Sequence, residues 1–171
     1  MTKVKREKKV KIPIRYLPTK LTKKDKKQQI SMLLKSRKQY KKGKYVTRKQ
    51  LSSYKSKKSN HIMNAQKLYN VSKIVPNKEL AAKTGCKIEA FAKIVNKGEG
   101  AYFSSGSRPN QTAKSWGLAR LASAITAGKA AAIDYNIISE GCDHKKKAFI
   151  LVLKSRRKYG YGLTKTKKVT I

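Results

Sequence analysis

Residues 87–128 read KIEAFAKIVNKGEGAYFSSGSRPNQTAKSWGLARLASAITAG, and this stretch alone indicates the fold class. Apolar residues recur in it twice with the i, i+3, i+4, i+7 spacing of one helix face, first at positions 88, 91, 92 and 95 and again at 118, 121, 122 and 125. Gly98 predicts the end of the first helix, Thr112 the N-cap of the second, and Gly128 its end. The stretch therefore predicts two amphipathic helices joined by a loop.

The residues between these helices, 100–117, favour a loop of defined shape over a reactive one. Its glycines permit backbone conformations that are closed to other residues, and Pro109 fixes one backbone angle. Its amides can satisfy backbone groups, and its aromatic side chains can pin the loop to a core. We therefore expect a rigid joint at which Trp116 anchors the second helix while Arg108 and Lys114 face a partner.

Similar patterns extend the helical prediction along the chain. Residues 10–16 alternate like a strand, and Pro13, which lacks a backbone donor, restricts them to a sheet edge or an extended arm. Residues 129–138 predict one short helix, and 148–154 predict either a buried strand or the last helix. The fold class predicted is mainly α: a compact domain of small helices with one or two short edge strands, flanked by basic extended arms. Three further helices with identifiable N-caps are predicted. The first covers 23–40 after Thr22, and the second covers 61–69 after Ser59 or Asn60. The third lies within 75–85, where it begins after Asn77 and ends at Gly85.

The charge is large and unevenly distributed. Lys and Arg total 44 against 8 Asp and Glu, which gives a formal net charge of +36 and indicates an anionic or tightly packed partner. Basic residues outnumber acidic ones by 23 to 2 in residues 1–60, by 11 to 5 in 61–140 and by 10 to 1 in 141–171. We therefore predict a basic N-terminal arm with one helix over 1–58, a compact helical core over 59–154, and a basic C-terminal arm over 155–171.

Catalytic groups are scarce. The only histidines, His61 and His144, lie far in sequence from the serines of the loop, so no nucleophile–base pair is indicated. Gly128 and Lys129 lack both the hydroxyl residue and the upstream glycine of a P-loop. We predict a non-enzymatic protein with no catalytic residue, no cofactor and no small-molecule substrate.

The two cysteines do not have the spacing of a metal site. Cys86 has no close ligand partner, and Cys142 lies only two residues from His144, whereas structural zinc sites use tight ligand pairs. No metal is therefore predicted. The cysteines are interpreted as small buried residues, with a disulfide between them as the alternative.

No membrane span or secretory leader is predicted. The longest apolar run, AFILVL at 148–153, is far shorter than the roughly 20 residues that a span needs. The N-terminus, MTKVKREKKVK, contains no apolar segment of the kind found in a signal peptide.

Tyrosines are interleaved with the basic residues of both arms, in 20–58 and again in the C-terminal tail. Phosphates can take the charge and bases can stack on the rings, so this pattern suits nucleic acid. Because no recognition signature of a sequence-specific binder is present, any such binding is predicted to be sequence-independent. The alternative is a solvated or protein-packed arm. The candidate interaction residues of the tail are Arg156, Arg157, Lys158 and Tyr159.

Four motifs are distinctive: TGC at 84–86, KGEGAY at 97–102, SGSRPNQTAKSW at 105–116 and ARLASAIT at 119–126. Through them, roughly residues 10–150 resemble a domain of undefined biochemical function found in large double-stranded DNA viruses of eukaryotes, among them algal viruses and marseilleviruses. The resemblance implies a virus-encoded protein of the virion, made in the host cytoplasm, and supplies no catalytic residues.

The resemblance and the charge together lead to an expected function. We expect a minor capsid protein that cements the inner side of the shell by binding the major capsid protein, other minor capsid proteins and the anionic surface of an inner membrane. Basic arms that become ordered on assembly suit this role. The alternative is a basic virion core protein that binds and condenses DNA.

Overall fold

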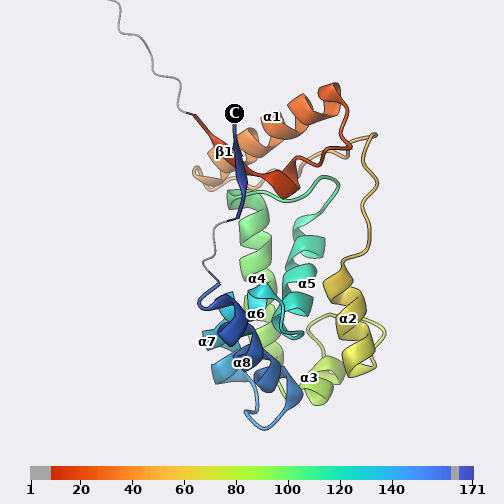
Figure 1. The fold of residues 1–171 in the computed structure, drawn as a ribbon, viewed down its shortest axis with the longest axis vertical. Helices are drawn as coiled ribbons and strands as arrows, with labels where there is room; N and C mark the ends of the chain where they lie inside the picture. The colour runs from red at the N-terminus through yellow and green to blue at the C-terminus, as the bar shows by residue number, and fades with distance from the viewer. Residues whose placement is uncertain (1–8, 163–165) are drawn as a thin grey trace, which may run out of the picture.

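Helices α4 (Ile88–Ser104) and α5 (Ala113–Ala124) form the central pair of the fold (Figure 1). They touch at two glycines, since a Cβ atom added to Gly98 would lie 2.6 Å from the Cα atom of Gly117. The prediction that the first helix ends at Gly98 is therefore wrong. Gly98 is buried inside α4, where the missing side chain lets the two backbones approach closely.

The structure is a computed structural model that describes residues 9–162 and 166–171. It is mainly helical, with 57% helix and eight α-helices in the described residues, which confirms the predicted fold class. The other elements are β1 (Lys11–Pro13), a 3-10 turn (Ile14–Tyr16), α1 (Lys23–Tyr40), α2 (Asn60–Tyr69), α3 (Lys78–Thr84), α6 (Lys129–Ile133), α7 (Tyr135–Gly141), α8 (Lys147–Tyr159) and β2 (Lys168–Thr170). No helix in the described part of the chain is long and apolar enough to cross a membrane.

The predicted N-caps of four helices are confirmed. Each side-chain oxygen accepts a hydrogen bond from a backbone N–H in the first turn of its helix, which satisfies a group that the helix itself leaves unpaired. The four caps are Thr22 on α1, Ser59 on α2, Asn77 on α3 and Thr112 on α5. Gly85 ends α3 with φ of 75°, as predicted.

The segment after α5 differs from the sequence prediction. Helix α5 ends at Ala124, and Gly128 is instead the N-cap position of α6. Residues 129–138 contain two helices rather than one, because the chain leaves helical geometry at Asp134. The choice left open for residues 148–154 is resolved as helix α8, so the predicted boundary between core and C-terminal arm lies inside this helix.

The main core surrounds the lower halves of α4 and α5. Its buried residues range from Ala65 on α2 to Val152 on α8, with Phe91 of α4 only 1% exposed. Cys86, before α4, and Cys142, after α7, are paired in a disulfide, which is the alternative that the sequence left open. The bond joins two segments that also form an isolated β-bridge.

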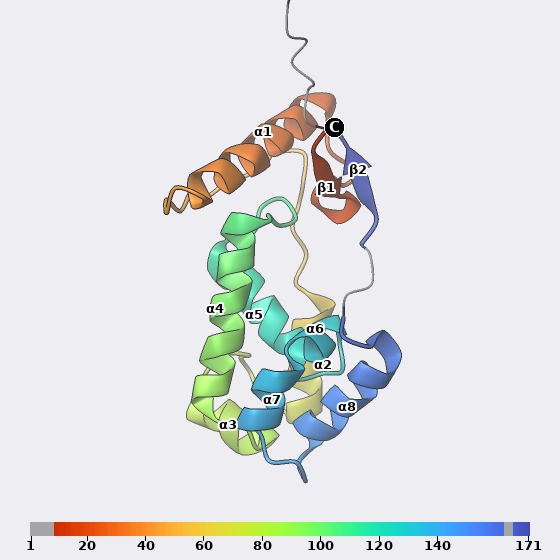
Figure 2. The same cartoon turned by 90° about the vertical axis from the view of Figure 1, so that its left-hand side faces the viewer.

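A second, smaller cluster lies above the main core, and we call the part of the molecule around it the upper part. It buries Ile12, Tyr16, Leu17 and Leu33, and the half-buried Trp116 packs against it. β2 pairs antiparallel with β1, so that Lys168 lies opposite Pro13 and the C-terminal strand returns to the N-terminal one. Figure 2 shows this two-stranded ribbon beside α1, which lies across the upper end of α4.

Candidate polyanion-binding surface

In the upper part, residues 9–58 present many cations and no Asp or Glu side chain to solvent. Residues 9–58 contain 19 Lys and Arg but one acidic residue, Asp25, which is buried. Its Oδ2 atom accepts hydrogen bonds from the Ser53 hydroxyl at 2.6 Å and the Ser53 backbone N–H at 2.9 Å, and these bonds lower the pKa of Asp25. The carboxylate therefore ties the loop near residue 53 to α1, and this single buried group cannot balance the many surface cations of the segment.

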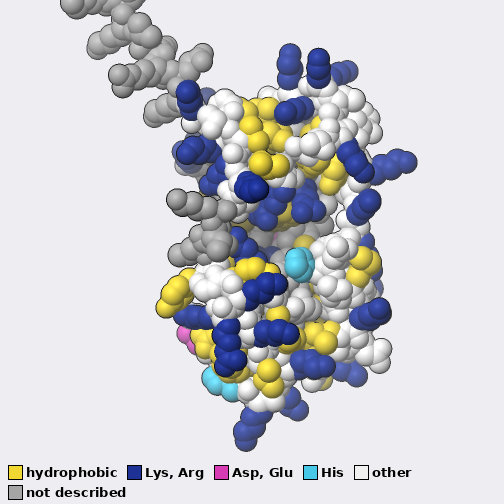
Figure 3. Space-filling model, viewed as in Figure 1, with side chains coloured by type: hydrophobic (Ala, Val, Ile, Leu, Met, Phe, Trp, Pro, Cys, Tyr) yellow, Lys and Arg dark blue, Asp and Glu magenta, His cyan; other side chains and the backbone are white. Residues whose placement is uncertain are grey.

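A second acidic residue, Asp134, is also buried and bonded to groups of its own chain. The side chain of Asp134 is fully buried and accepts two hydrogen bonds of 2.8 Å from Arg120 and one of 2.6 Å from Lys97. This fork geometry is the strong form of an ion pair. Figure 3 shows the result, since Lys and Arg cover both the upper and the lower half of that face while Asp and Glu are almost absent from it.

Arg48 is a buried cation that holds the upper part together. Its guanidinium lies 3.8 Å from the ring centre of Tyr102 and donates to the Ser36 hydroxyl, the Tyr102 carbonyl and the Ser107 hydroxyl at 2.8–3.0 Å. Burial lowers the pKa of Arg48, and these three acceptors are neutral oxygens. The residue joins α1 and the end of α4 to the loop that follows α4.

The upper part is hollowed between β1, β2, the last turn of α1 and the end of α4. This hollow, which we call the basic hollow, has a volume of about 480 Å³. Arg37 is oriented there by two carbonyls, since its Nε atom donates to Ser105 at 2.8 Å and one terminal nitrogen donates to Lys11 at 3.2 Å. Among the described residues, the lining contains no carboxylate side chain but four cations and four hydroxyl residues: Lys11, Arg37, Lys41 and Lys168, with Tyr16, Ser104, Ser105 and Thr166.

Such a lining fits phosphate oxygens. Cations and hydroxyls both donate hydrogen bonds to an anion, and a guanidinium fixed by its neighbours loses little freedom on binding. The four cations come from three segments that are far apart in the sequence, the first strand, α1 and the last strand. Sequence patterns did not find this group, because only the return of the tail to β1 brings them together.

The joint predicted over 100–117 is shorter than expected and spans residues 105–112 between α4 and α5. Asn110 stands there with φ of 60° and pins the loop to another segment. Its oxygen accepts from the Leu51 N–H at 2.6 Å, and its nitrogen donates to the carbonyls of Leu51 and Tyr54. The amide thus satisfies the backbone of a remote segment rather than that of its own loop.

The residues predicted to act with this joint are separated by their environment. Arg108 and Lys114 are exposed, whereas Trp116 is half-buried and meets Tyr16 edge-on with ring centres 6.1 Å apart. Trp116 therefore anchors α5 to the second cluster and not to the main core.

The candidate residues of the tail lie at the end of α8, away from this joint (Figure 1). The Arg156 guanidinium lies between the rings of Tyr135 and Tyr161, at 4.1 and 4.4 Å. Lys158 lies 5.1 Å from the ring centre of Tyr159, and Arg157 is exposed. The structure thus divides the predicted interaction residues into two separate groups.

Neither histidine belongs to a group that could hold a metal ion in the described residues. His144 stacks on Phe149 with ring centres 3.8 Å apart. His61 lies at the start of α2, and burial and the charge of Arg108 lower its pKa. Within residues 9–162 and 166–171, no three His, Cys, Asp or Glu side chains are grouped to hold a metal ion.

Comparison with known proteins places the chain in a family. No curated protein and no solved structure matches the chain. A family model does match, and it covers residues 13–147, from the end of β1 to the start of α8. Because this match covers most of the chain, the protein belongs to the family of unknown function DUF5824.

Proposed function

We propose that the protein is a non-enzymatic structural protein that binds nucleic acid through its phosphates, without reading the base sequence. One observation carries this proposal: apart from Arg37 and Arg48, the cations of residues 9–58 are exposed, while the only carboxylate side chain of this segment is buried. A surface of this kind attracts any dense polyanion, and each neutralised phosphate releases condensed counterions. The basic hollow adds a place where several phosphate oxygens can be held at once.

The expected signature is a steep dependence on salt. Each phosphate contact contributes about 0.9 to the slope of log K against log salt for duplex DNA. If the four cations of the hollow each neutralise one phosphate, they alone contribute a slope of roughly 3 to 4.

A salt titration of binding to several duplexes of unrelated sequence tests the proposal. The variant Lys11→Gln/Lys41→Gln/Lys168→Gln removes three exposed cations from the hollow. A matched control, Lys73→Gln/Lys83→Gln/Lys93→Gln, removes three cations from the lower part. We expect equal affinity for all duplexes and a slope reduced more by the first variant than by the second. Binding that is insensitive to salt, or that selects one sequence, would contradict the proposal.

A minor capsid protein is the second candidate, and exposed apolar side chains favour it. Met63, Ile133 and Ile150 are 42–55% exposed, and such residues can pack against neighbouring proteins of a shell. It ranks second because the described parts of both predicted arms pack on their own chain, through α1 and through the pairing of β2 with β1. Gentle disruption of purified virus particles distinguishes the two proposed functions. A minor capsid protein stays with the shell, and a nucleic-acid-binding protein stays with the genome.

A further inference from the structure

We propose that this protein prefers single-stranded nucleic acid, with an unpaired base stacked on Tyr45 and the adjoining phosphates held in the basic hollow. This inference rests on the proposed function and adds the class of nucleic acid to it. The site combines the basic hollow with a group of three rings that we call the aromatic platform: Tyr40, Tyr45 and Phe103.

The platform presents a large aromatic surface to solvent. Tyr45 is 69% exposed, although its ring lies against two others, with ring centres 5.9 Å from Tyr40 and 5.2 Å from Phe103. It stands in the segment between α1 and α2, outside any helix or strand. A tyrosine in such a position contributes little burial to the fold, and its open surface is available to a base.

The platform is supported from below by the buried network around Arg48. Phe103 meets the fully buried Tyr102 edge-on with ring centres 5.0 Å apart, and Tyr102 in turn carries the Arg48 guanidinium at 3.8 Å. The backbone N–H of Arg48 also donates to the Tyr102 hydroxyl at 3.2 Å. The Phe103 ring that supports Tyr45 is therefore held in place before any ligand arrives, which reduces the entropy lost on stacking.

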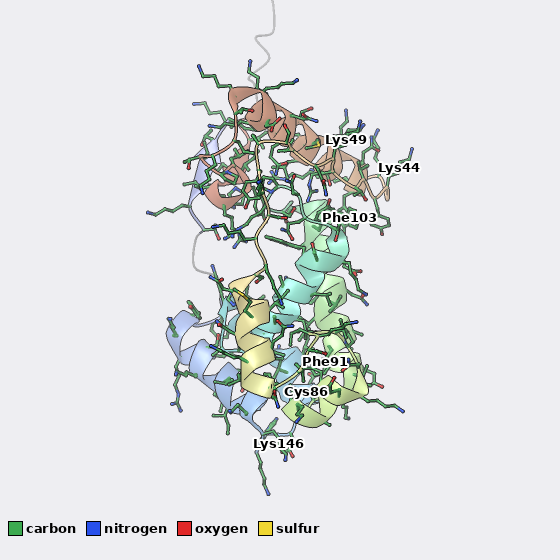
Figure 4. The ribbon with its side chains drawn as sticks, turned by 90° about the vertical axis from the view of Figure 1, so that its right-hand side faces the viewer. Lys44, Lys49, Cys86, Phe91, Phe103 and Lys146 are labelled. Carbon is green, nitrogen blue, oxygen red and sulfur yellow. A yellow bond between two sulfur atoms is a disulfide. The ribbon has the colours of Figure 1, made fainter. Side chains whose placement is uncertain are left out.

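Cations and the hollow lie next to the platform. Figure 4 shows Phe103 with Lys44 and Lys49 at the same edge of the upper part, and both lysines are exposed. Tyr40 precedes Lys41 at the end of α1, and Phe103 precedes Ser104 at the end of α4. At both helix ends one residue belongs to the platform and the next to the basic hollow.

This placement of aromatic residues beside basic ones suits single-stranded nucleic acid better than a duplex. In a duplex the base faces are covered by their neighbours, so the protein can reach phosphates and groove edges but has no base face to stack on. In a single strand a base can turn out onto a ring while its phosphate stays in a basic site, and every base has an aromatic face, so sequence matters little. The platform therefore adds affinity for single strands only, whereas the hollow serves both forms.

Fluorescence anisotropy with the full chain tests this. Three labelled ligands of equal length are compared: a single-stranded oligothymidylate, a duplex, and an abasic single strand with the same phosphates. Stacking of one base corresponds to roughly a 5- to 150-fold change in affinity. We expect Tyr45→Ala to weaken binding of the oligothymidylate by that factor while leaving the duplex and the abasic strand unchanged, and we expect Tyr45→Phe to bind like the wild type.

Tyr161→Ala is the matched control, because Tyr161 is 70% exposed and also lies beside a cation, outside the platform. It should bind all three ligands like the wild type. The inference is overturned if Tyr45→Ala leaves oligothymidylate binding unchanged or weakens all three ligands equally. If salt-dependent duplex binding persists in that case, the proposed function stands without the single-strand preference. If no ligand binds, both are refuted.

Discussion

Replacing Gly98 by alanine perturbs the point where the two central helices touch. The added Cβ atom would lie 2.6 Å from the Cα atom of Gly117 and 3.3 Å from the Cβ atom of Arg120. The nearer of these atoms is backbone and cannot rotate away, so α4 and α5 must separate. The change therefore tests whether this glycine serves helix packing, as the structure indicates, or the end of a helix, as the sequence pattern predicted.

Two opposing effects set the size of the change. Alanine is a better helix former than glycine by about 1 kcal/mol, which alone would stabilise the protein. Overpacking costs about 1–3 kcal/mol, and the upper end applies here because backbone opposes backbone. We therefore expect Gly98→Ala to lower the free energy of unfolding by about 1–2 kcal/mol.

Gly100 provides the matched control, because it lies in the same helix two residues later and a Cβ atom there would have nothing within 4 Å. Gly100→Ala should therefore raise the free energy of unfolding by about 1 kcal/mol. Urea unfolding followed by circular dichroism measures both variants, and the expected difference between them corresponds to about 4–12 °C in Tm for a chain of this size. Equal stabilisation by the two substitutions would refute the packing argument.

Three further predictions follow from the buried contacts. Hydrogen bonds from Ser53 hold the pKa of Asp25 below the ordinary 3.8, so the stability that this residue contributes is present above about pH 4 and is lost as the pH falls further. Asp25→Asn should therefore flatten the acid side of a plot of unfolding free energy against pH. Arg48→Met leaves three acceptors without their donor and should cost about 3 kcal/mol in denaturant unfolding, whereas a loss below about 1 kcal/mol would mean that water replaces the guanidinium. Trp116→Ala should cost about 2 kcal/mol, less than a truncation in the main core, and an unchanged Tm would show that the residue does not anchor α5.

A last prediction concerns the disulfide. Cys86 and Cys142 are separated by 56 positions, and closing a loop of that length in the unfolded chain corresponds to about 4 kcal/mol. Reduction of the oxidised protein should therefore lower Tm, and the variant Cys86→Ser/Cys142→Ser should make Tm independent of reductant. A reductant-dependent Tm in that variant would show that the effect has another source.

Local chemistry made several features predictable. Thr22, Asn77 and Thr112 were identified as caps because a cap satisfies backbone groups within the next three residues, so the partners are adjacent in the sequence. The helix faces were readable for the same reason, and Pro13 marked a sheet edge because it lacks a backbone donor. The basic composition likewise indicates an anionic partner, because net charge depends only on which residues are present.

Other features depend on neighbours that no local pattern contains. Glycine both ends helices and lets helices touch, and only the position of Gly117 decides between these roles for Gly98. Arg48 looked like one more cation of a basic arm, but its acceptors lie 12 to 59 residues away and bury it. The basic hollow exists only because β2 pairs with β1. The sequence by itself determined most of the helices, four of their caps and the charge, since these depend on composition or on residues a few positions apart. The tertiary structure alone decided where the central helices end, which charges are buried and which gather into a site, because these depend on contacts between remote segments.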